Sequence, residues 1–267
     1  MIKTDFHLHT NMSTDSSATI ELMVQRAIDL GLTEIAFTDH DDHNPADEGA
    51  GMYDPVKAYQ ASLSARQRFG GTIAIRHGVE IGEPHLFAKE NQALYQLPLD
   101  IIIGSVHCIG PYGVHSDLFD HKTPAEGISE YFRLTLDMAK FADMDVLGHL
   151  DYFDRYTALR NIPPYNPNEY EDQISAILEV IISRNIALEI NTSGLRSANP
   201  RPFPHPDVLK WHHRMGGRLI CIGSDAHRPE QIAYGFEQTE DILRDIGFCE
   251  YHVFRARKPH CAPIKND

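Results

Sequence analysis

The chain contains 267 residues, 42% of them hydrophobic and 23% charged, and its formal net charge is -14. This size and composition are typical of one large globular domain with a substantial core. The acidity argues against a broad nucleic-acid surface, and no apolar run approaches the roughly 18 residues needed to cross a membrane.

Short apolar runs that end in ionisable residues recur along the chain and predict β-strands. In a parallel barrel such strand ends meet at one mouth, so residues far apart in the sequence gather there. Seven runs occur in chain order: before His7 and His9, before Asp39 and His40, at residues 73–79 before Glu80, at residues 101–106 before His107, at residues 146–148 before His149, at residues 187–188 before Glu189, and at residues 219–224 before Asp225 and His227.

Apolar residues at helical spacing follow the predicted strands. Helices are expected at residues 20–30, 59–69, 124–143, 174–182, 206–216 and 229–246. Seven β-then-α units predict an α/β fold, a TIM-like (β/α)7 barrel with parallel strands, one unit short of the usual eight. We find no linker or composition shift, so a single domain is expected over residues 1–267.

Four long connections are expected on the ligand-bearing side of this barrel, at residues 41–54, 108–122, 152–168 and 193–206. Long loops on that side are where substrate selection should lie. His43 and His115 lie in these loops and are candidate substrate contacts, with solvated surface positions as the alternative.

His7 and His9 face the same side of a strand, because residues i and i+2 share a face. This H-x-H pattern alone is a weak signal in a chain with 16 histidines. Asp225 and His227 repeat the spacing on the last strand, which lies beside the first in a closed barrel, and this makes the signal strong. Imidazole and carboxylate together suit zinc, iron or manganese rather than calcium.

Nine residues in all are candidate metal ligands. They are His7, His9, Asp15, His40, Glu80, His107, His149, Asp225 and His227. A catalytic zinc commonly takes three protein ligands, so this set predicts two to three divalent ions, with Glu80 as a bridge. Two ions about 3.5–4 Å apart could hold a hydroxide for attack on phosphorus. The alternatives are a set of hydrogen-bonded barrel residues and, for Asp15, a cap of the first helix.

These residues match a known pattern, and the chain resembles the PHP (polymerase and histidinol phosphatase) superfamily of trinuclear metallo-phosphoesterases. The match runs from residue 2 to about residue 236, with the motifs in the same order. The matching segments are His7-Leu8-His9-Thr10, Thr38-Asp39-His40, Gly78-Val79-Glu80, Ser105-Val106-His107, Gly148-His149-Leu150-Asp151, Glu189-Ile190-Asn191-Thr192-Ser193-Gly194 and Ser224-Asp225-Ala226-His227. Residues 151–156 and 191–196 look most like PHP-type L-histidinol-phosphate phosphatases.

The resemblance implies a distorted seven-stranded barrel and a distribution of the ligands over three ions. One ion would be held by His7, His9, Glu80 and Asp225, a second by Glu80, His107 and His149, and a third by Asp15, His40 and His227. It also implies a phosphomonoesterase of histidine biosynthesis that converts L-histidinol phosphate to L-histidinol and phosphate.

The phosphate needs positive charge beyond the metals, and a guanidinium group matches its oxygens. Arg155 and Arg196 follow two strand ends and are the candidates, with Arg160 as a third; pairing with Asp151 or Asp154 is the alternative for the first two. A departing alkoxide needs a proton, which Asp15 or His227 could provide.

Other polar residues near the strand ends have weaker assignments. Asp39 and Asp151 are either partners that orient histidines or ordinary strand-end carboxylates. Glu189 and Asn191 point the same way as each other and are expected to line the site.

Three other functions compete with a phosphomonoesterase acting on a small metabolite. A nucleotide phosphoesterase or 5'-3' exonuclease would use the same metal centre, but a long polymer needs basic or aromatic residues along a groove. A non-catalytic metal-binding domain would have gaps in the ligand set, and we find none. A protein-tyrosine phosphatase needs an open site, which the long loops restrict.

The expected setting is the cytoplasm, because the chain starts without a basic region and apolar stretch. The four cysteines have no C-x-x-C spacing, which favours idle thiols over a zinc knuckle or a redox pair. The expected partner is a small phosphorylated substrate rather than a long nucleic acid or a membrane. The protein is expected as a monomer or small homo-oligomer.

Overall fold

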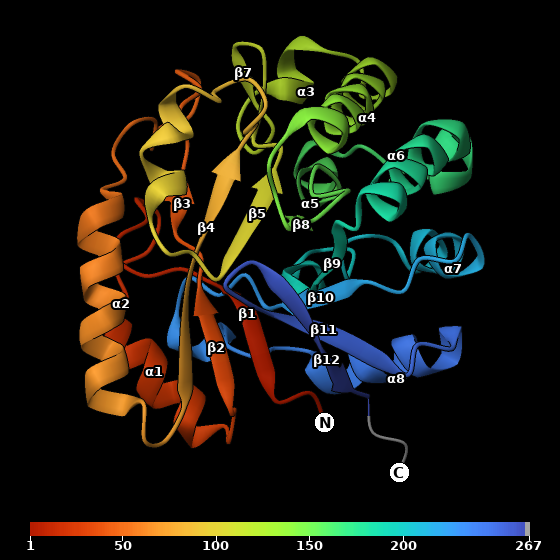
Figure 1. Ribbon diagram of the computed structural model, residues 1–267. Helices are drawn as coiled ribbons and strands as arrows, with labels where there is room; N and C mark the ends of the chain where they lie inside the picture. Colours follow the sequence, from red (N-terminus) through yellow and green to blue (C-terminus); the bar gives the residue numbers. More distant parts are fainter. Residues whose placement is uncertain (265–267) are drawn as a thin grey trace.

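A parallel sheet of seven consecutive strands curves into a barrel in the computed structural model, which describes residues 1–264 (Figure 1). Neighbouring strands pair in parallel throughout. The strands in spatial order are β1 (Thr4–Leu8), β2 (Glu34–Phe37), β4 (Ala74–Gly82), β5 (Ile101–Ser105), β8 (Val146–Leu147), β9 (Ala187–Asn191) and β10 (Ile220–Gly223). The predicted distorted barrel is confirmed.

The first and last strands meet at their carboxyl ends. Leu8 forms a parallel bridge to Ala226, and the His9 amide donates to the Ala226 carbonyl at 2.9 Å. The barrel is therefore closed at its mouth, where β1 and the segment after β10 lie side by side.

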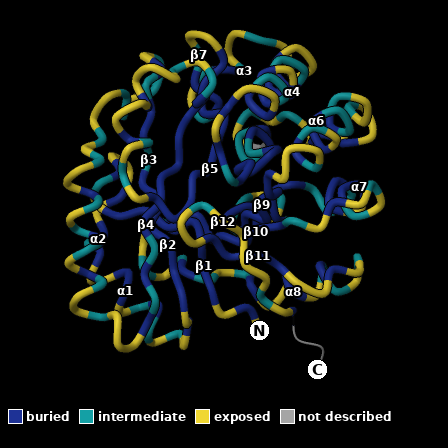
Figure 2. Tube along the Cα trace, viewed as in Figure 1, coloured by how far each residue is buried: buried dark blue, intermediate teal, exposed yellow. Residues whose placement is uncertain are grey.

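Helices cover the outside of the sheet and expose their outer faces (Figures 1 and 2). Their starts follow from local sequence: Thr19 and Asp54 accept hydrogen bonds as N-caps, and Thr123 forms a capping box with Glu126. The helices are α1 (Ile20–Asp29), α2 (Pro55–Phe69), α4 (Pro124–Phe141), α6 (Glu171–Arg184), α7 (Pro206–Arg214) and α8 (Phe236–Ile246).

Two of the seven expected β-then-α units differ in the structure. Between β4 and β5, the described chain forms only the 3-10 turns η1 (Glu90–Gln92) and η2 (Leu94–Gln96), because Pro84 and Pro98 restrict a short connection. The helix predicted over residues 229–246 is interrupted, since the turn η6 (Pro229–Gln231) precedes α8 and Gly235 takes a φ of 71°. The interruption lets the Ala233 amide donate to Asp5 Oδ2 at 3.0 Å.

The four long connections predicted at the ligand-bearing side form short elements of their own. They hold the two-residue strand β3 (His40–Asp41), which pairs with β4, and the small hairpin of β6 (Cys108–Ile109) and β7 (Tyr112–Gly113). Further short elements are α3 (Leu118–His121), α5 (Asp154–Thr157), η3 (Ala158–Arg160), η4 (Pro167–Tyr170) and η5 (Thr192–Arg196).

A C-terminal hairpin that the sequence patterns did not predict covers the opposite end of the barrel. It consists of β11 (Glu250–Arg255) and β12 (Lys258–Pro263). Arg255 contacts Glu34 at the start of β2, and the Ala256 amide donates to Asp100 just before β5. The hairpin therefore lies where the barrel strands begin, far from the ligand-bearing mouth.

The barrel interior and the layer beneath the helices are buried (Figure 2). Apolar side chains form one large cluster around β4–β10 and a smaller one where β1 and β2 pack on α1 and α2. No helix in residues 1–264 is long and apolar enough to cross a membrane. Of the single domain predicted over residues 1–267, residues 265–267 lie outside the described residues.

Candidate metal centre

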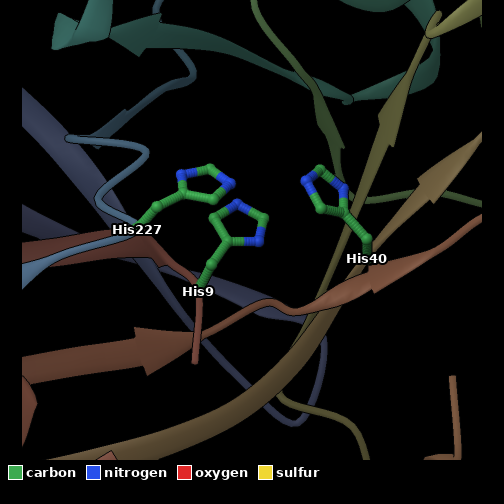
Figure 3. Close-up of side chains that lie close together, drawn as sticks. All are labelled: His9, His40 and His227. Atoms are coloured by element: carbon green, nitrogen blue, oxygen red, sulfur yellow. The ribbon is translucent and has the colours of Figure 1, made fainter. Parts of the chain in front are cut away.

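The nine residues predicted as ligands lie together at the barrel mouth. His7 belongs to β1, His40 to β3 and Glu80 to β4. The other six lie in the segments that follow β1, β5, β8 and β10: His9, Asp15, His107, His149, Asp225 and His227. The rings of His9, His40 and His227 turn toward one another (Figure 3), with the His9 ring centroid 4.3 Å from that of His40 and 4.1 Å from that of His227.

Glu80 is fully buried at the centre of this group. Its Oε2 lies 3.1 Å from His7 Nε2 and 3.0 Å from His40 Nδ1. Its Oε1 lies 2.8 Å from His149 Nε2 and 3.4 Å from His107 Nε2. One carboxylate thus contacts imidazoles from β1, β3 and the ends of β5 and β8, which suits a ligand shared between ions.

Asp225 joins the histidines of the first strand to those of the last. Its Oδ1 lies 3.4 Å from His9 Nε2, 4.0 Å from His7 Nε2 and 3.5 Å from His227 Nδ1. The residue has a φ of 52°, in the left-handed region that aspartate tolerates better than most side chains. This sharp bend after β10 turns the Asp225 carboxylate toward the histidines of β1.

Asp15 lies at the outer edge of the cluster, where 53% of its side chain is exposed. Its Oδ2 is 2.8 Å from His227 Nε2 and 3.6 Å from His40 Nε2. The alternative role as a helix cap is wrong, because Thr19 caps α1 by accepting from the Leu22 amide.

Buried atoms without hydrogen bonds test whether cations fit here. Several ring nitrogens and one carboxylate oxygen that face the cluster have no such partner: His7 Nε2, His9 Nε2, His40 Nδ1, Glu80 Oε2 and His227 Nε2. These atoms contact one another, as His7 Nε2 and Glu80 Oε2 do at 3.1 Å, but they form no hydrogen bond there, and a missing hydrogen bond at a buried polar atom costs roughly 1–3 kcal/mol. Divalent cations would satisfy these lone pairs, and the mixture of imidazole and carboxylate fits zinc, iron or manganese.

The electrostatics of the cluster point the same way. Burial, with the charges of His227 and His40, lowers the pKa of His9 to about 3, which leaves a neutral ring with a free lone pair. Although burial alone would raise the pKa of Glu80, the charges of His7 and His40 hold it well below its usual value. Positive charge is therefore required around this carboxylate, and divalent cations can replace the imidazole protons that otherwise supply it.

Two carboxylates hold the far nitrogens of the histidine rings. His7 Nδ1 lies 2.5 Å from Glu189 Oε1, and His107 Nδ1 lies 2.8 Å from Asp42 Oδ1. Such partners fix the orientation of a metal-binding imidazole and raise its basicity. Glu189 was expected to line the site, but Asp42 was missed. The available signal was its position two residues after His40, on the same face of an extended segment.

The structure gives different roles to Asp39 and Asp151, the two strand-end carboxylates for which the sequence left two roles open. Asp39 accepts from the Thr10 amide at 2.5 Å and from Ser13 Oγ at 2.9 Å, and that hydroxyl lies 3.1 Å from His9 Nδ1. Asp39 therefore orients a histidine through one hydroxyl. Asp151 instead accepts from the His205 amide at 2.8 Å, so it holds a loop.

Pairing with Asp151 or Asp154 was the alternative role for Arg155 and Arg196. In the structure, Arg201 forms these ion pairs instead. Its Nη1 lies 3.0 Å from Asp151 Oδ2 and its Nη2 lies 2.8 Å from Asp154 Oδ2. Arg155 and Arg196 pair with neither of these carboxylates and instead reach the mouth. Arg201 was not predicted from the sequence, because its partners lie about 50 residues away in the chain.

Arg155 and Arg196 line a cavity of about 460 Å³ above the cluster. Arg155 donates to Ser193 Oγ, and Arg196 donates to the Ser224 carbonyl at 2.9 Å. Arg228 also lines this cavity and was not predicted. The lining residues are Asp15, His40, Glu80, His107, His149, Tyr152, Arg155, Tyr156, Ser193, Arg196, Ser197, Asp225, His227, Arg228 and Gln231.

An adjoining cavity of about 330 Å³ shares Tyr152 and Tyr156 with the first and is more acidic. Asp47, Glu48 and the predicted His115 contribute to its wall. The mouth therefore has arginines on one side and carboxylates on the other.

Two predicted substrate contacts lie elsewhere. Arg160 pairs with Asp120, its Nε 3.0 Å from Oδ1, and also donates to the Ser116 carbonyl. His43 Nε2 lies 3.3 Å from Asp41 Oδ1. Neither lines the two cavities at the mouth, so the structure does not bring them to the site.

Comparisons with known proteins agree with this geometry. The PHP domain model matches residues 5–193. A histidinol-phosphatase of Lactococcus lactis is 30% identical over 97% of this chain and 96% of its own length, and a probable histidinol-phosphatase of Clostridium acetobutylicum is 31% identical over 88% and 90%. A crystal structure of the histidinol phosphate phosphatase of L. lactis with zinc, L-histidinol and phosphate matches with a TM-score of 0.84 and 30% identity, over 97% of this chain and 98% of that chain.

Proposed function

The chain belongs to the PHP domain family, and from this premise we propose that it is a metal-dependent phosphomonoesterase that hydrolyses L-histidinol phosphate to L-histidinol and phosphate. The observation that carries the proposal is the convergence of nine imidazoles and carboxylates beneath a cavity lined by arginines. The related L. lactis enzyme with zinc, L-histidinol and phosphate supports the substrate. One domain carries the whole site.

Three groups of residues would hold the cations. His7, His9, Glu80 and Asp225 form the first, Glu80 with His107 and His149 the second, and Asp15 with His40 and His227 the third. Members of each group lie within reach of one another. The bound ions, zinc, iron or manganese, supply Lewis-acid charge to the phosphoryl oxygens and make water more acidic. Glu189 and Asp42 fix the orientation of the His7 and His107 imidazoles for metal binding.

The arginines bind and orient the phosphate. Arg155 lies over the rings of Tyr152 and Phe203, which hold its guanidinium at the cavity wall. Arg196 is fixed by two carbonyls, those of Ser224 and Asp225. Because these groups are already placed, little conformational entropy is lost when they meet the charge that develops on the phosphoryl oxygens.

The leaving alkoxide takes a proton from the outer edge of the cluster. Asp15 and His227 both line the cavity, so each side chain is placed to pass a proton to the leaving oxygen. Either residue can deliver it, and the variants Asp15→Asn and His227→Gln separate them. A leaving group that is more acidic needs less protonation. The proton donor is therefore the residue whose substitution lowers activity less on a substrate with such a leaving group.

The acidic side of the mouth matches the organic part of the substrate. L-Histidinol carries an ammonium group and an imidazole, and Asp47, Glu48 and His115 line the adjoining cavity. A nucleoside monophosphate would bring no compensating cation to this wall. The substrate is therefore an amino-alcohol phosphate rather than a nucleotide.

One assay tests the proposal against its rivals. Purified protein loaded with manganese, iron or zinc is given histidinol phosphate, a nucleoside monophosphate and bis-p-nitrophenyl phosphate. We expect the largest kcat/KM for histidinol phosphate. A preference for the nucleotide would support the alternative phosphoesterase, and a strong preference for the diester would reject a monoesterase altogether.

We also propose that the protein works in the cytoplasm. The free cysteines Cys108, Cys221, Cys249 and Cys261 fit a reducing compartment. A monomer or small homo-oligomer is sufficient, because every residue of the site comes from one chain.

A further inference from the structure

A second group of metal-ligating side chains lies on the C-terminal hairpin. Glu250 and His252 are two residues apart on β11 and so share a face, and Cys261 on β12 is the cross-strand partner of His252. The hairpin contacts Glu34 and Asp100, where the barrel strands begin. This group is therefore at the opposite end of the barrel from the phosphatase site.

The sulfur–nitrogen distance within the group matches an edge of a metal tetrahedron, and the carboxylate lies slightly farther out. Cys261 Sγ lies 3.4 Å from His252 Nε2, and Glu250 Oε1 lies 4.0 Å from the same nitrogen. The three ligand atoms lie within 4.8 Å of one another. With Zn–S of about 2.3 Å and Zn–N of about 2.0 Å, a tetrahedral site separates sulfur and nitrogen by roughly 3.5 Å.

The three side chains differ in exposure in a way that suits ion entry. Only 10% of the His252 side chain is exposed, which fixes its ring, whereas 49% of the Glu250 side chain is exposed. Cys261 is also exposed. An ion can thus reach the group from solvent and keep one position for water, while the ring presents a nitrogen held by packing.

We propose that Glu250, His252 and Cys261 form a second cation site that binds Zn²⁺ or a similar thiophilic divalent ion. Thiolate, imidazole and carboxylate together select zinc over magnesium or calcium. On binding, the Cys261 thiol releases its proton to water and the Sγ–metal bond forms. The ion joins β11 to β12 and stabilises the hairpin that covers the end of the barrel where the strands begin, which we call the floor.

Metal analysis of the full-length protein tests this proposal. Wild type, Cys261→Ser and the matched control Cys249→Ser, which removes the other exposed thiol, are equilibrated with Zn²⁺ and passed through a desalting column. We expect wild type and Cys249→Ser to retain one more equivalent of zinc than Cys261→Ser. All three should hydrolyse histidinol phosphate equally, which also verifies that each variant is folded.

Cadmium provides a direct readout of the sulfur ligand. Cd²⁺ added to the zinc-loaded protein should give an ultraviolet thiolate-to-cadmium absorption band in wild type and Cys249→Ser. The band should be absent from Cys261→Ser and weaker at equal Cd²⁺ in Glu250→Gln. Equal zinc content in wild type and Cys261→Ser, or a cadmium band that persists without Cys261, would overturn the proposal. The outcome does not depend on which phosphate ester the enzyme prefers.

Discussion

The two ends of the barrel hold many carboxylates but neutralise them in different ways. At the hairpin end they meet arginines: Glu34 Oε2 lies 2.7 Å from Arg255 Nη2, and Asp145 Oδ2 lies 3.1 Å from Arg257 Nε. At the mouth, the ion-pair contacts of Glu80 are with ring nitrogens, and Asp225 adds the more distant Arg155 Nη2, at 3.8 Å, to its histidines.

This contrast separates stability from function. An arginine is always charged and presents several donors, so Glu34 and Asp145 are neutralised within the chain. Imidazoles supply positive charge only when protonated, and the mouth keeps buried nitrogens and an oxygen without hydrogen bonds. The mouth therefore needs cations from solution, whereas Glu34 and Asp145 at the hairpin end do not.

The largest expected effect comes from removing a ligand at the mouth. Asp225→Asn or His9→Ala should lower bound metal and reduce kcat by at least roughly a hundredfold, because metal-ion catalysis is worth several kcal/mol. Steady-state assays with metal analysis of each variant check this. Full turnover in a protein lacking its metal would contradict the proposed role of the mouth.

A smaller effect is expected from Asp42, whose carboxylate contacts the ligands His107 and His40 and is not itself assigned to an ion. Asp42→Asn keeps the shape of the side chain but weakens its contact to His107 Nδ1. Metal affinity should fall roughly 10–100-fold. Excess metal in the assay should restore kcat, which distinguishes this positioning role from direct ligation. The measurement is activity against free metal concentration.

Removal of a phosphate-binding arginine should act mainly on capture. Arg196→Ala is expected to raise KM roughly tenfold with a smaller change in kcat, because a hydrogen bond to a charged group contributes about 1.5–3 kcal/mol. Arg160→Ala is the matched control, since Arg160 pairs with Asp120 away from both cavities. Identical kinetics for the two variants would remove Arg196 from the phosphate site.

The stability of the protein should depend on pH through His77, which lies toward the hairpin end of the barrel. His77 is buried beside Ser62 and Asp100. Burial, with the charge of Arg66, lowers the pKa of His77 from 6.5 to about 4. Because the unfolded chain binds the proton first, stability should fall as the pH drops from about 6.5 to 4, by at most about 1.4 kcal/mol per pH unit. Denaturant unfolding of wild type and His77→Gln checks this, and the variant should show the shallower loss.

The smallest effect is expected from the arginine pairs of the floor. Arg257→Ala leaves Asp145 without its cation and should destabilise the protein by about 1 kcal/mol, since partly exposed pairs contribute little. Turnover of histidinol phosphate should not change. A loss of activity without a loss of stability would show that the two ends are coupled.

Much of the candidate site was predictable because its signal is local. A strand places residues i and i+2 on one face. The spacing of His7 and His9, and of Asp225 and His227, therefore predicted that both members of each pair face the site. The apolar runs and the helical spacing of apolar residues predicted the barrel in the same way. The broken helix at 229–246 was not predictable from its periodicity, because the tie between Ala233 and Asp5 joins residues far apart in the chain.

The sequence by itself thus determined the strand-end ligands and the barrel that gathers them, since strand and helix periods act over a few residues. Only the tertiary structure decided which carboxylate holds which ring, that Arg201 rather than Arg155 pairs with Asp151, and that a hairpin covers the floor. These contacts depend on distances between segments that meet only after folding. No local pattern of side chains specifies such distances.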